Sequence, residues 1–381
     1  MPIFTSNYPH FQPGTATLLP TPERTGALPE YTGRGVVIAF IDSGFYVHPD
    51  LEGRVLVHVN ASTRHVVEEK TIASTNDFSW HGQMTSVIAA GDGRMSEGKY
   101  RGIASGAQVV LIKITSPQGQ IKEADILRGL RWLNDMYRRF DVHVVNISVG
   151  GDFVSNDPDH PLHLAISTLV ANGVTVLVAA GNKGTHSLVP PASAPHAITV
   201  GGYNDHNSLD RTLWTPYHNN YGNAYDGSAK PEILAAANWI ASPILPGSAM
   251  EREARWLAPL LAEEKPNGAL KNLLKNGFTD LGFTKDQLSK SAARLYKTIQ
   301  QRIDKHKLVD AYHQHVDGTS VSTAVASAVV AQMLEANPRL TPAQIKTILR
   351  DTAQPLADVP SEKQGGGVID PAAAVKMALK T

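Results

Sequence analysis

Three separated segments of this chain each carry a residue that could take part in nucleophilic catalysis. Asp42 follows the apolar run 36–41, His81 begins a helix of small residues, and Ser320 opens the apolar run 321–336. A serine hydroxyl is hardly ionised at neutral pH, so it needs a base to take its proton and a carboxylate to orient that base. Asp42, His81 and Ser320 supply these three groups, in that chain order.

Each of these residues, taken alone, has a simpler structural explanation. Asp42 could cap a turn, a lone histidine is more often a core or surface residue, and Ser320 could be the N-cap of its helix. A fourth group makes the combination more informative. Asn182 ends the strand-like run 176–180, where its amide could donate a hydrogen bond to the oxyanion of a tetrahedral intermediate, although it could also be a turn residue.

The pattern of apolar segments predicts the scaffold that positions these residues. Segments with helical spacing, at 123–140 and 161–172, lie between short apolar runs. Such alternation indicates an α/β fold, with a mostly parallel sheet covered by helices, and sites in such sheets form at the carboxyl ends of strands. The runs predicted to be strands buried on both faces are 36–41, 109–114, 142–147, 174–180 and 197–201.

Two segments depart from this alternation. Residues 1–33 are rich in Pro, Thr and Gly without a sustained period, and we expect an irregular N-terminal arm. The remaining residues, 34–381, form one domain that carries a helical insertion, 248–312, before Ser320. The insertion contains no strand-like run and shows the 3.6-residue period of helices at 251–264, 268–276 and 285–306.

The composition argues against several classes of function. Lys and Arg total 35, as do Asp and Glu, so the zero formal net charge offers nucleic acid no attraction. The absence of Cys excludes disulfides, zinc–thiolate sites and thiol nucleophiles. No apolar run approaches the roughly 18 residues of a membrane span, and residues 1–6 lack the features of a signal peptide. We therefore expect a soluble, cytoplasmic protein, or a secreted one if the sequence is a mature fragment.

The motifs around the four chemical groups resemble those of the subtilase family, the subtilisin-like serine peptidases of family S8. In family order they are Asp42-Ser43-Gly44, His81-Gly82, Ala180-Gly181-Asn182 and Gly318-Thr319-Ser320. Supporting matches are His48-Pro49-Asp50-Leu51, Gly102-Ile103-Ala104, Lys230-Pro231-Glu232 and Gly367-Val368-Ile369-Asp370. The resemblance spans about residues 35–374. It implies a doubly wound sheet and peptide-bond hydrolysis through an acyl-enzyme on Ser320.

The resemblance also implies roles for individual residues. His81 would be the general base and acid, Asp42 would orient it, and Asn182 would lie in the oxyanion hole. The polypeptide substrate would bind between two walls as an extended strand; tight packing could instead explain the glycines in these walls. The residues implied are Ser148, Val149, Gly150 and Gly151 in one wall, and Ala179, Ala180 and Gly181 in the other.

No cofactor is required by the implied mechanism. Calcium is frequent in the family, but the loop 91–98 offers only two carboxylates with Arg94 between them, which is weak evidence for a calcium site. We assign no calcium or other metal ligand.

The sequence departs from the family pattern near the implied nucleophile and oxyanion donor. Ala324 replaces the usual proline, so its N–H can bond the Ser320 carbonyl and shift the hydroxyl. We expect slower hydrolysis, or transfer of the acyl group to amines, because catalysis is sensitive to displacements of about 1 Å. Lys183 would disfavour basic P1 residues if it lies at the rim of the primary pocket, or it could be only a solvated charge.

Three functions are therefore open: a serine endopeptidase, an acyl-enzyme peptide ligase or transpeptidase, and an inactive scaffold. The insertion 248–312 could be a lid, a docking surface for a protein partner, or decoration. A scaffold has no physical need for a base, an orienting carboxylate and an oxyanion donor together, which favours the endopeptidase.

Overall fold

A nine-stranded sheet forms the centre of the computed structural model, which describes residues 18–69, 78–262, 267–284 and 292–381. Its strand order is β11-β7-β6-β5-β1-β4-β2-β3, and β8 pairs with β7. The strands are β1 (Val37–Asp42), β2 (Val55–Asn60), β3 (Val67–Glu69), β4 (Gln108–Lys113), β5 (Val142–Ile147), β6 (Thr175–Ala179), β7 (Ile198–Asn204), β8 (Thr215–Pro216) and β11 (Ile233–Ala236).

The strands from β2 to β11 pair in parallel, and only the pairings of β3 and β8 in this sheet are antiparallel. The strand β1 shows why the core strands are almost continuously apolar: Ile38 and Phe40 join the core on one face, while Val37, Ala39 and Ile41 join the core on the other. The mostly parallel α/β sheet is confirmed, and the five predicted strands agree with the structure to within three residues at each end.

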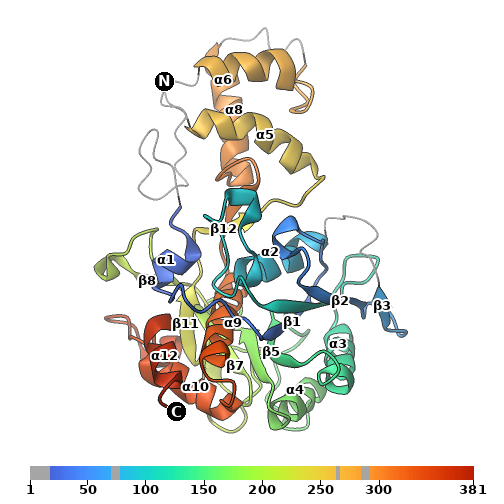
Figure 1. Cartoon of the computed structure of the whole chain (residues 1–381), viewed down its shortest axis with the longest axis vertical. Helices are drawn as coiled ribbons and strands as arrows, with labels where there is room; N and C mark the ends of the chain where they lie inside the picture. The colour runs from blue at the N-terminus through green and yellow to red at the C-terminus, as the bar shows by residue number, and fades with distance from the viewer. Residues whose placement is uncertain (1–17, 70–77, 263–266, 285–291) are drawn as a thin grey trace.

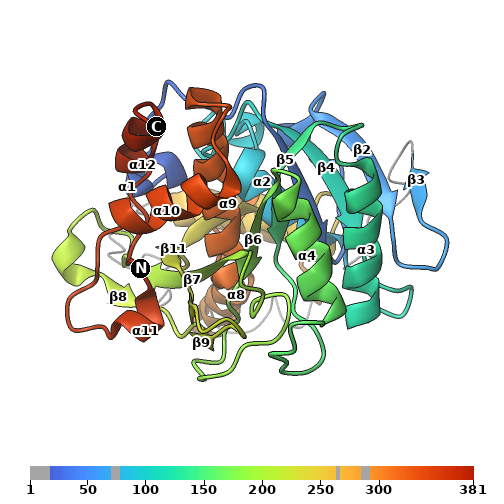
Figure 2. The ribbon, with the colours of Figure 1, turned by 90° about the horizontal axis from the view of Figure 1, so that it is seen from below.

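Helices cover both faces of the sheet, as a doubly wound fold requires. Figure 2 shows α3 (Glu123–Met136) and α4 (Pro161–Ala171) together on one face. The helices on the second face are α2 (Ser79–Ala90), α9 (Thr319–Ala336), α10 (Pro342–Thr352) and α12 (Pro371–Ala378). Of these, α9 packs against β5, β6, β7 and β11 and also contacts α2. No helix in the described part of the chain has the length and apolar character needed to cross a bilayer.

The helical insertion stands away from the sheet with a small core of its own (Figure 1). Leucines from α5 pack with Ile299 and Ile303 of α8, so each helix turns its apolar face inward. The insertion begins and ends at an antiparallel pair, β12 (Ile240–Pro243) and β13 (His313–Val316), and β12 contacts α2. Part of the last predicted helix, 285–291, lies outside the described residues. The helices are α5 (Ala249–Ala262), α6 (Asn267–Asn272), the π-helix η4 (Leu273–Gly277) and α8 (Ala292–His306).

The prediction of an irregular arm is wrong for Thr21–Thr25, which form the short helix α1. Pro22 stands in its first turn, and Gly26 ends it in the left-handed conformation. Arg24 is buried, and its Nε lies 2.7 Å from Asp205 Oδ2. This long-range ion pair attaches the segment to the domain. Residues 1–17 lie outside the described part of the chain.

Candidate active site

The end of β1 brings a buried carboxylate against a histidine. Asp42 is the last residue of β1, and its Oδ1 lies 2.6 Å from His81 Nδ1. The same oxygen accepts from the Ser43 backbone N–H, while Oδ2 accepts from the Thr85 hydroxyl at 3.0 Å. Asp42 is inaccessible to solvent, so these bonds hold the carboxylate in one orientation toward the imidazole.

The histidine lies in the first turn of α2, and a glycine allows this helix to approach β1. A Cβ on Gly82 would lie only 2.1 Å from the Gly44 carbonyl oxygen, so another residue would push the helix away. The His81 side chain remains 31% exposed and therefore accessible to a reactant. Desolvation lowers the pKa of His81, but the charge and hydrogen bond of Asp42 outweigh it and raise the net pKa above its ordinary value.

The serine stands at the same edge of the sheet, in the first turn of α9. Ile41 and Ile147 are register partners in β1 and β5, so the next residues, Asp42 and Ser148, stand at the same end of neighbouring strands. The Ser320 hydroxyl donates to the Ser148 carbonyl at 3.3 Å. The structure describes both Ser320 and His81 and records no hydrogen bond between them. The bond between a nucleophile and its base often tightens only in the complex with substrate.

The space where a side chain on Gly318 would stand lies near two hydrogen-bond donors. Asn182 Oδ1 accepts from the Thr319 N–H at 2.9 Å and from its hydroxyl at 2.8 Å, which fixes the orientation of the amide. A Cβ on Gly318 would lie 3.5 Å from Asn182 Nδ2 and 3.9 Å from Ser320 N. Backbone N–H groups in the first turn of a helix have no intrahelical partner. The two donors can therefore serve a single oxygen atom that occupies this volume.

The predicted substrate walls flank Ser320, but their glycines have different surroundings. Gly150 is exposed. The Gly151 N–H, by contrast, donates to the Pro190 carbonyl at 2.6 Å, and a Cβ there would meet Glu123 Oε2. Gly151 is thus required for packing, and its N–H already donates a hydrogen bond within the protein, so it is not available to a substrate strand. Ser148, the first residue of this wall, is buried, and its hydroxyl donates to the Ser320 carbonyl at 3.4 Å.

In the second wall, Gly181 has a φ of 98° and its N–H donates to the Thr319 hydroxyl at 3.1 Å. A Cβ on Gly181 would lie 2.8 Å from Asn220 Nδ2, so the position accepts only glycine. Ala179 is half-buried and Ala180 is buried. This wall is therefore held directly against the residue that precedes Ser320.

The remaining residues singled out in the sequence take no part in these contacts. Lys183 is exposed, and its backbone N–H donates to Asn220 Oδ1 at 2.8 Å. Ala324 is buried within α9. In the loop 91–98, the two Asp92 oxygens accept from Arg94. Within the described ranges, no group of three or more His, Asp or Glu side chains is arranged to hold a metal ion.

Comparison with known proteins decides the family. The model of the subtilase family matches residues 33–367. The chain belongs to the subtilase family. Among curated relatives, this subtilase is 28% identical to serine protease AprX from Bacillus subtilis (strain 168) over 348 residues, 89% of this chain and 66% of AprX. It is 28% identical to Subtilisin BL from Lederbergia lenta over 266 residues, 66% of this chain and 87% of that protein.

Solved structures show the same fold. The protease domain of PatA, in a mutant form, superimposes with a TM-score of 0.61 at 19% identity, covering 92% of this subtilase and 98% of that chain. Fervidolysin from Fervidobacterium pennivorans gives a TM-score of 0.62 at 19% identity, covering 93% of this subtilase and 45% of that chain. The predicted family and fold are confirmed, and by family the chain is a hydrolase of the subtilisin-like serine endopeptidase class.

Proposed function

We propose that this subtilase hydrolyses peptide bonds in polypeptide substrates through an acyl-enzyme on Ser320. One observation carries the proposal: an oriented histidine–carboxylate pair and a volume faced by two hydrogen-bond donors lie at the same edge of the sheet as Ser320. A binding scaffold gains nothing from this arrangement, whereas acyl transfer needs each part of it.

The proton and electron movements follow from the positions of the side chains. Neutral His81 accepts the proton of the Ser320 hydroxyl through Nε2 while Oγ attacks the substrate carbonyl carbon. The imidazolium is stabilised by Asp42 at Nδ1, 2.6 Å away. It then donates its proton to the leaving amine as the C–N bond breaks. Water next attacks the ester carbonyl, with His81 again taking the proton, and the acid product leaves.

The oxyanion of each tetrahedral intermediate would occupy the volume beside Gly318. Asn182 Nδ2 and the Ser320 N–H are the donors that face it. The two bonds from Thr319 to Asn182 Oδ1 hold the amide in place before the substrate arrives. Such preorganised donors stabilise charge that develops only in the transition state.

Transfer of the acyl group to an amine is a second candidate, favoured by one feature. Ala324, where the family usually has proline, is fully buried in α9, one helical turn after Ser320. An added amine acceptor tests this candidate: the ratio of transfer to hydrolysis should fall in an Ala324→Pro variant. An unchanged ratio would remove the role given to Ala324.

The hydrolytic function is tested by kinetics on an extended peptide. Ser320→Ala and His81→Ala should each lower kcat by about a millionfold, and the double variant no further, as in a subtilisin whose triad acts as a unit. Ser327→Ala is the matched control, because Ser327 is a buried serine of the same helix that bonds Asn146. It should retain near-normal kcat. Equal activity of Ser320→Ala and this control would contradict the proposal.

A further inference from the structure

The end of the helical insertion contacts the segment that precedes Ser320. α8 runs from the outer part of the insertion back toward the sheet and ends at His306 (Figure 1). The Nζ of Lys307, the next residue, lies 2.6 Å from Asp317 Oδ1. Asp317 directly precedes Gly318 in the chain. The insertion therefore reaches the turn that carries the proposed nucleophile.

The backbone conformation of Lys307 would suit glycine better than lysine. Its φ of 50° lies in the left-handed region, where a side chain is unfavourable and where helices commonly end on glycine. A lysine that is held in this conformation indicates a use for its side chain. The hydrogen bond recorded for that side chain is the one to Asp317.

The backbone of Lys307 is fixed against β13. Its carbonyl accepts from the His315 N–H at 2.8 Å, and the next residue, Leu308, forms a β-bridge with Gln314. β13 in turn pairs with β12 along its whole length. We call this β12–β13 pair the base of the insertion. Because the base fixes the backbone of Lys307, the ion pair can fix the position of Asp317.

The turn after Asp317 holds groups of the candidate active site. The Gly318 N–H donates to the Ala237 carbonyl at 2.9 Å, and the Thr319 N–H donates to Asn182 Oδ1 at 2.9 Å. These bonds constrain the turn itself, whereas the ion pair constrains its beginning. A displacement of Asp317 would therefore be passed on to the residues that orient the proposed oxyanion donors.

The base of the insertion also contacts the helix that carries His81. β12 packs against α2, and Gln83 Nε2 lies 3.5 Å from the Ile244 carbonyl oxygen. Gln83 is fully buried, and Ile244 belongs to the core of the insertion. The insertion thus adjoins both the helix of the proposed base and the turn of the proposed nucleophile. Its position can therefore affect the distance between Ser320 and His81.

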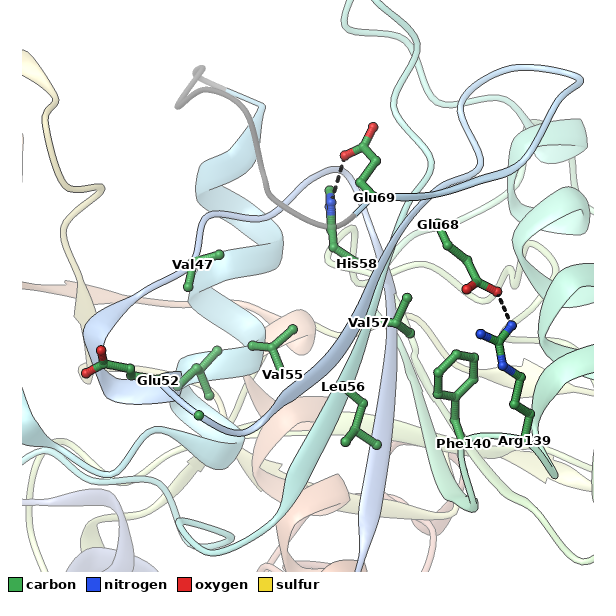
Figure 3. Close-up of a pocket in the computed structure, with 12 residues that line it drawn as sticks. Val47, Glu52, Val55, Leu56, Val57, His58, Glu68, Glu69, Arg139 and Phe140 are labelled. Carbon is green, nitrogen blue, oxygen red and sulfur yellow. Dashed lines mark hydrogen bonds and ion pairs between the residues drawn. The ribbon is translucent and has the colours of Figure 1, made fainter.

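The ion pair can supply position more readily than stability. The side chains of Lys307 and Asp317 are 43% and 38% exposed, and such an exposed pair adds little to the free energy of unfolding. A comparable pair lies at the cavity of about 490 Å³ beside β2, where Arg139 Nη1 is 2.7 Å from Glu68 Oε1 (Figure 3). That pair joins the segment after α3 to β3 and does not touch the candidate active site.

We propose that Lys307 is a positioning residue for Ser320: its ion pair with Asp317 sets the position of the turn 318–319, so the insertion helps to align the nucleophile. This role rests on the proposed function of Ser320. Catalysis is sensitive to small displacements, but an ion pair this exposed can bias a position only modestly. The expected effect on kcat is therefore about fivefold.

Steady-state kinetics on a short peptide test this role. Lys307→Met and Asp317→Asn should each lower kcat about fivefold with KM unchanged, and the double variant should lose no more than either. Lys307→Arg keeps the charge and should recover at least half of the normal kcat. Arg139→Met is the matched control, because it removes the other exposed ion pair (Figure 3); it should keep the normal kcat.

Salt tests whether the charge of Lys307 is responsible. Exposed ion pairs are screened strongly at about 1 M NaCl. The ratio of kcat in the parent protein to kcat in Lys307→Met should therefore fall toward one as salt is added. A ratio that stays constant would overturn the role of the ion pair.

Lys307→Gly separates position from stability. Glycine accepts the left-handed conformation without strain, so the free energy of unfolding, measured with denaturant, should not fall. The kcat should nevertheless fall as it does in Lys307→Met. If Lys307 only stabilised the fold, Lys307→Gly would be as active as the parent protein, and that result would overturn the proposal.

Hydrogen exchange tests the same contact without catalysis. The Gly318 N–H, which donates to Ala237, should exchange about fivefold faster in Lys307→Met than in the parent protein, as measured by NMR. Arg139→Met should leave this rate unchanged. Equal exchange at Gly318 in the parent and Lys307→Met would overturn the proposal. Faster exchange in a parent protein that hydrolyses no peptide would contradict the proposed function and leave the positioning of the turn established.

Discussion

Replacing Gly318 with alanine tests the oxyanion volume directly. The added methyl carbon would lie 3.5 Å from Asn182 Nδ2 and 3.9 Å from Ser320 N, inside the space that an oxyanion bonded to both donors must use. Loss of one such donor lowers kcat about 100- to 1000-fold, or roughly 2.7–4 kcal/mol, in a subtilisin. We expect at least this loss in Gly318→Ala. KM should change little, because the oxyanion exists only in the transition state.

Backbone strain must be separated from this effect. Gly318 has a φ of 137°, so alanine also costs on the order of 1–3 kcal/mol of stability. Gly247→Ala is the matched control, because Gly247 has a φ of 75° and open space around its Cα. Denaturant unfolding should show both variants folded, and steady-state kinetics should show the kcat loss in Gly318→Ala alone. A folded Gly318→Ala enzyme with more than a third of the normal kcat would refute the assignment of this volume.

Three further predictions concern charge. Asp42→Asn should lower kcat about ten-thousandfold, as in a related triad. Because Asp42 raises the pKa of His81, the acid limb of the residual kcat/KM profile should also move to lower pH. An acid limb at higher pH would contradict this. Burial, partly offset by Glu232, lowers the pKa of Lys230 to about 8 from 10.5, so the unfolded state binds the proton more tightly and the free energy of unfolding should rise from pH 8 to 10.5. Lys230→Met should remove that rise in denaturant titrations, while Lys346 stays paired with Glu232 at 2.5 Å. A rise that persists in this variant would show that it does not come from Lys230. Lys183→Glu should increase kcat/KM for P1 Arg over P1 Leu by about three- to tenfold at low salt, and no change in a P1-varied peptide panel would show that Lys183 lies too far from the pocket.

The candidate chemical groups stand out in the sequence because each stands where a buried run begins or ends. Asp42 closes an apolar strand, and Ser320 opens an apolar helix, so the boundaries of the core mark them. The contacts that orient these groups carry no comparable signal. The bond from Thr85 to Asp42, the two from Thr319 to Asn182, and the present bond of Ser320 to the Ser148 carbonyl depend on three-dimensional proximity alone.

The burial of one strand also could not be read from the sequence. β13 has the polar sequence His313-Gln314-His315-Val316, yet all four residues are buried, because β13 pairs with β12 and the rings of Tyr100 and Trp239 lie against His313 and His315. Tertiary contacts here override a weak intrinsic preference.

We propose that Ser320 is a nucleophile activated by His81. Reaction with a fluorophosphonate probe, followed by peptide mapping, measures this directly. We predict one covalent adduct, on Ser320, that is lost in Ser320→Ala and strongly slowed in His81→Ala, with Ser327→Ala labelled at the normal rate. Labelling that is absent in the wild type, or that persists in Ser320→Ala, would contradict the account.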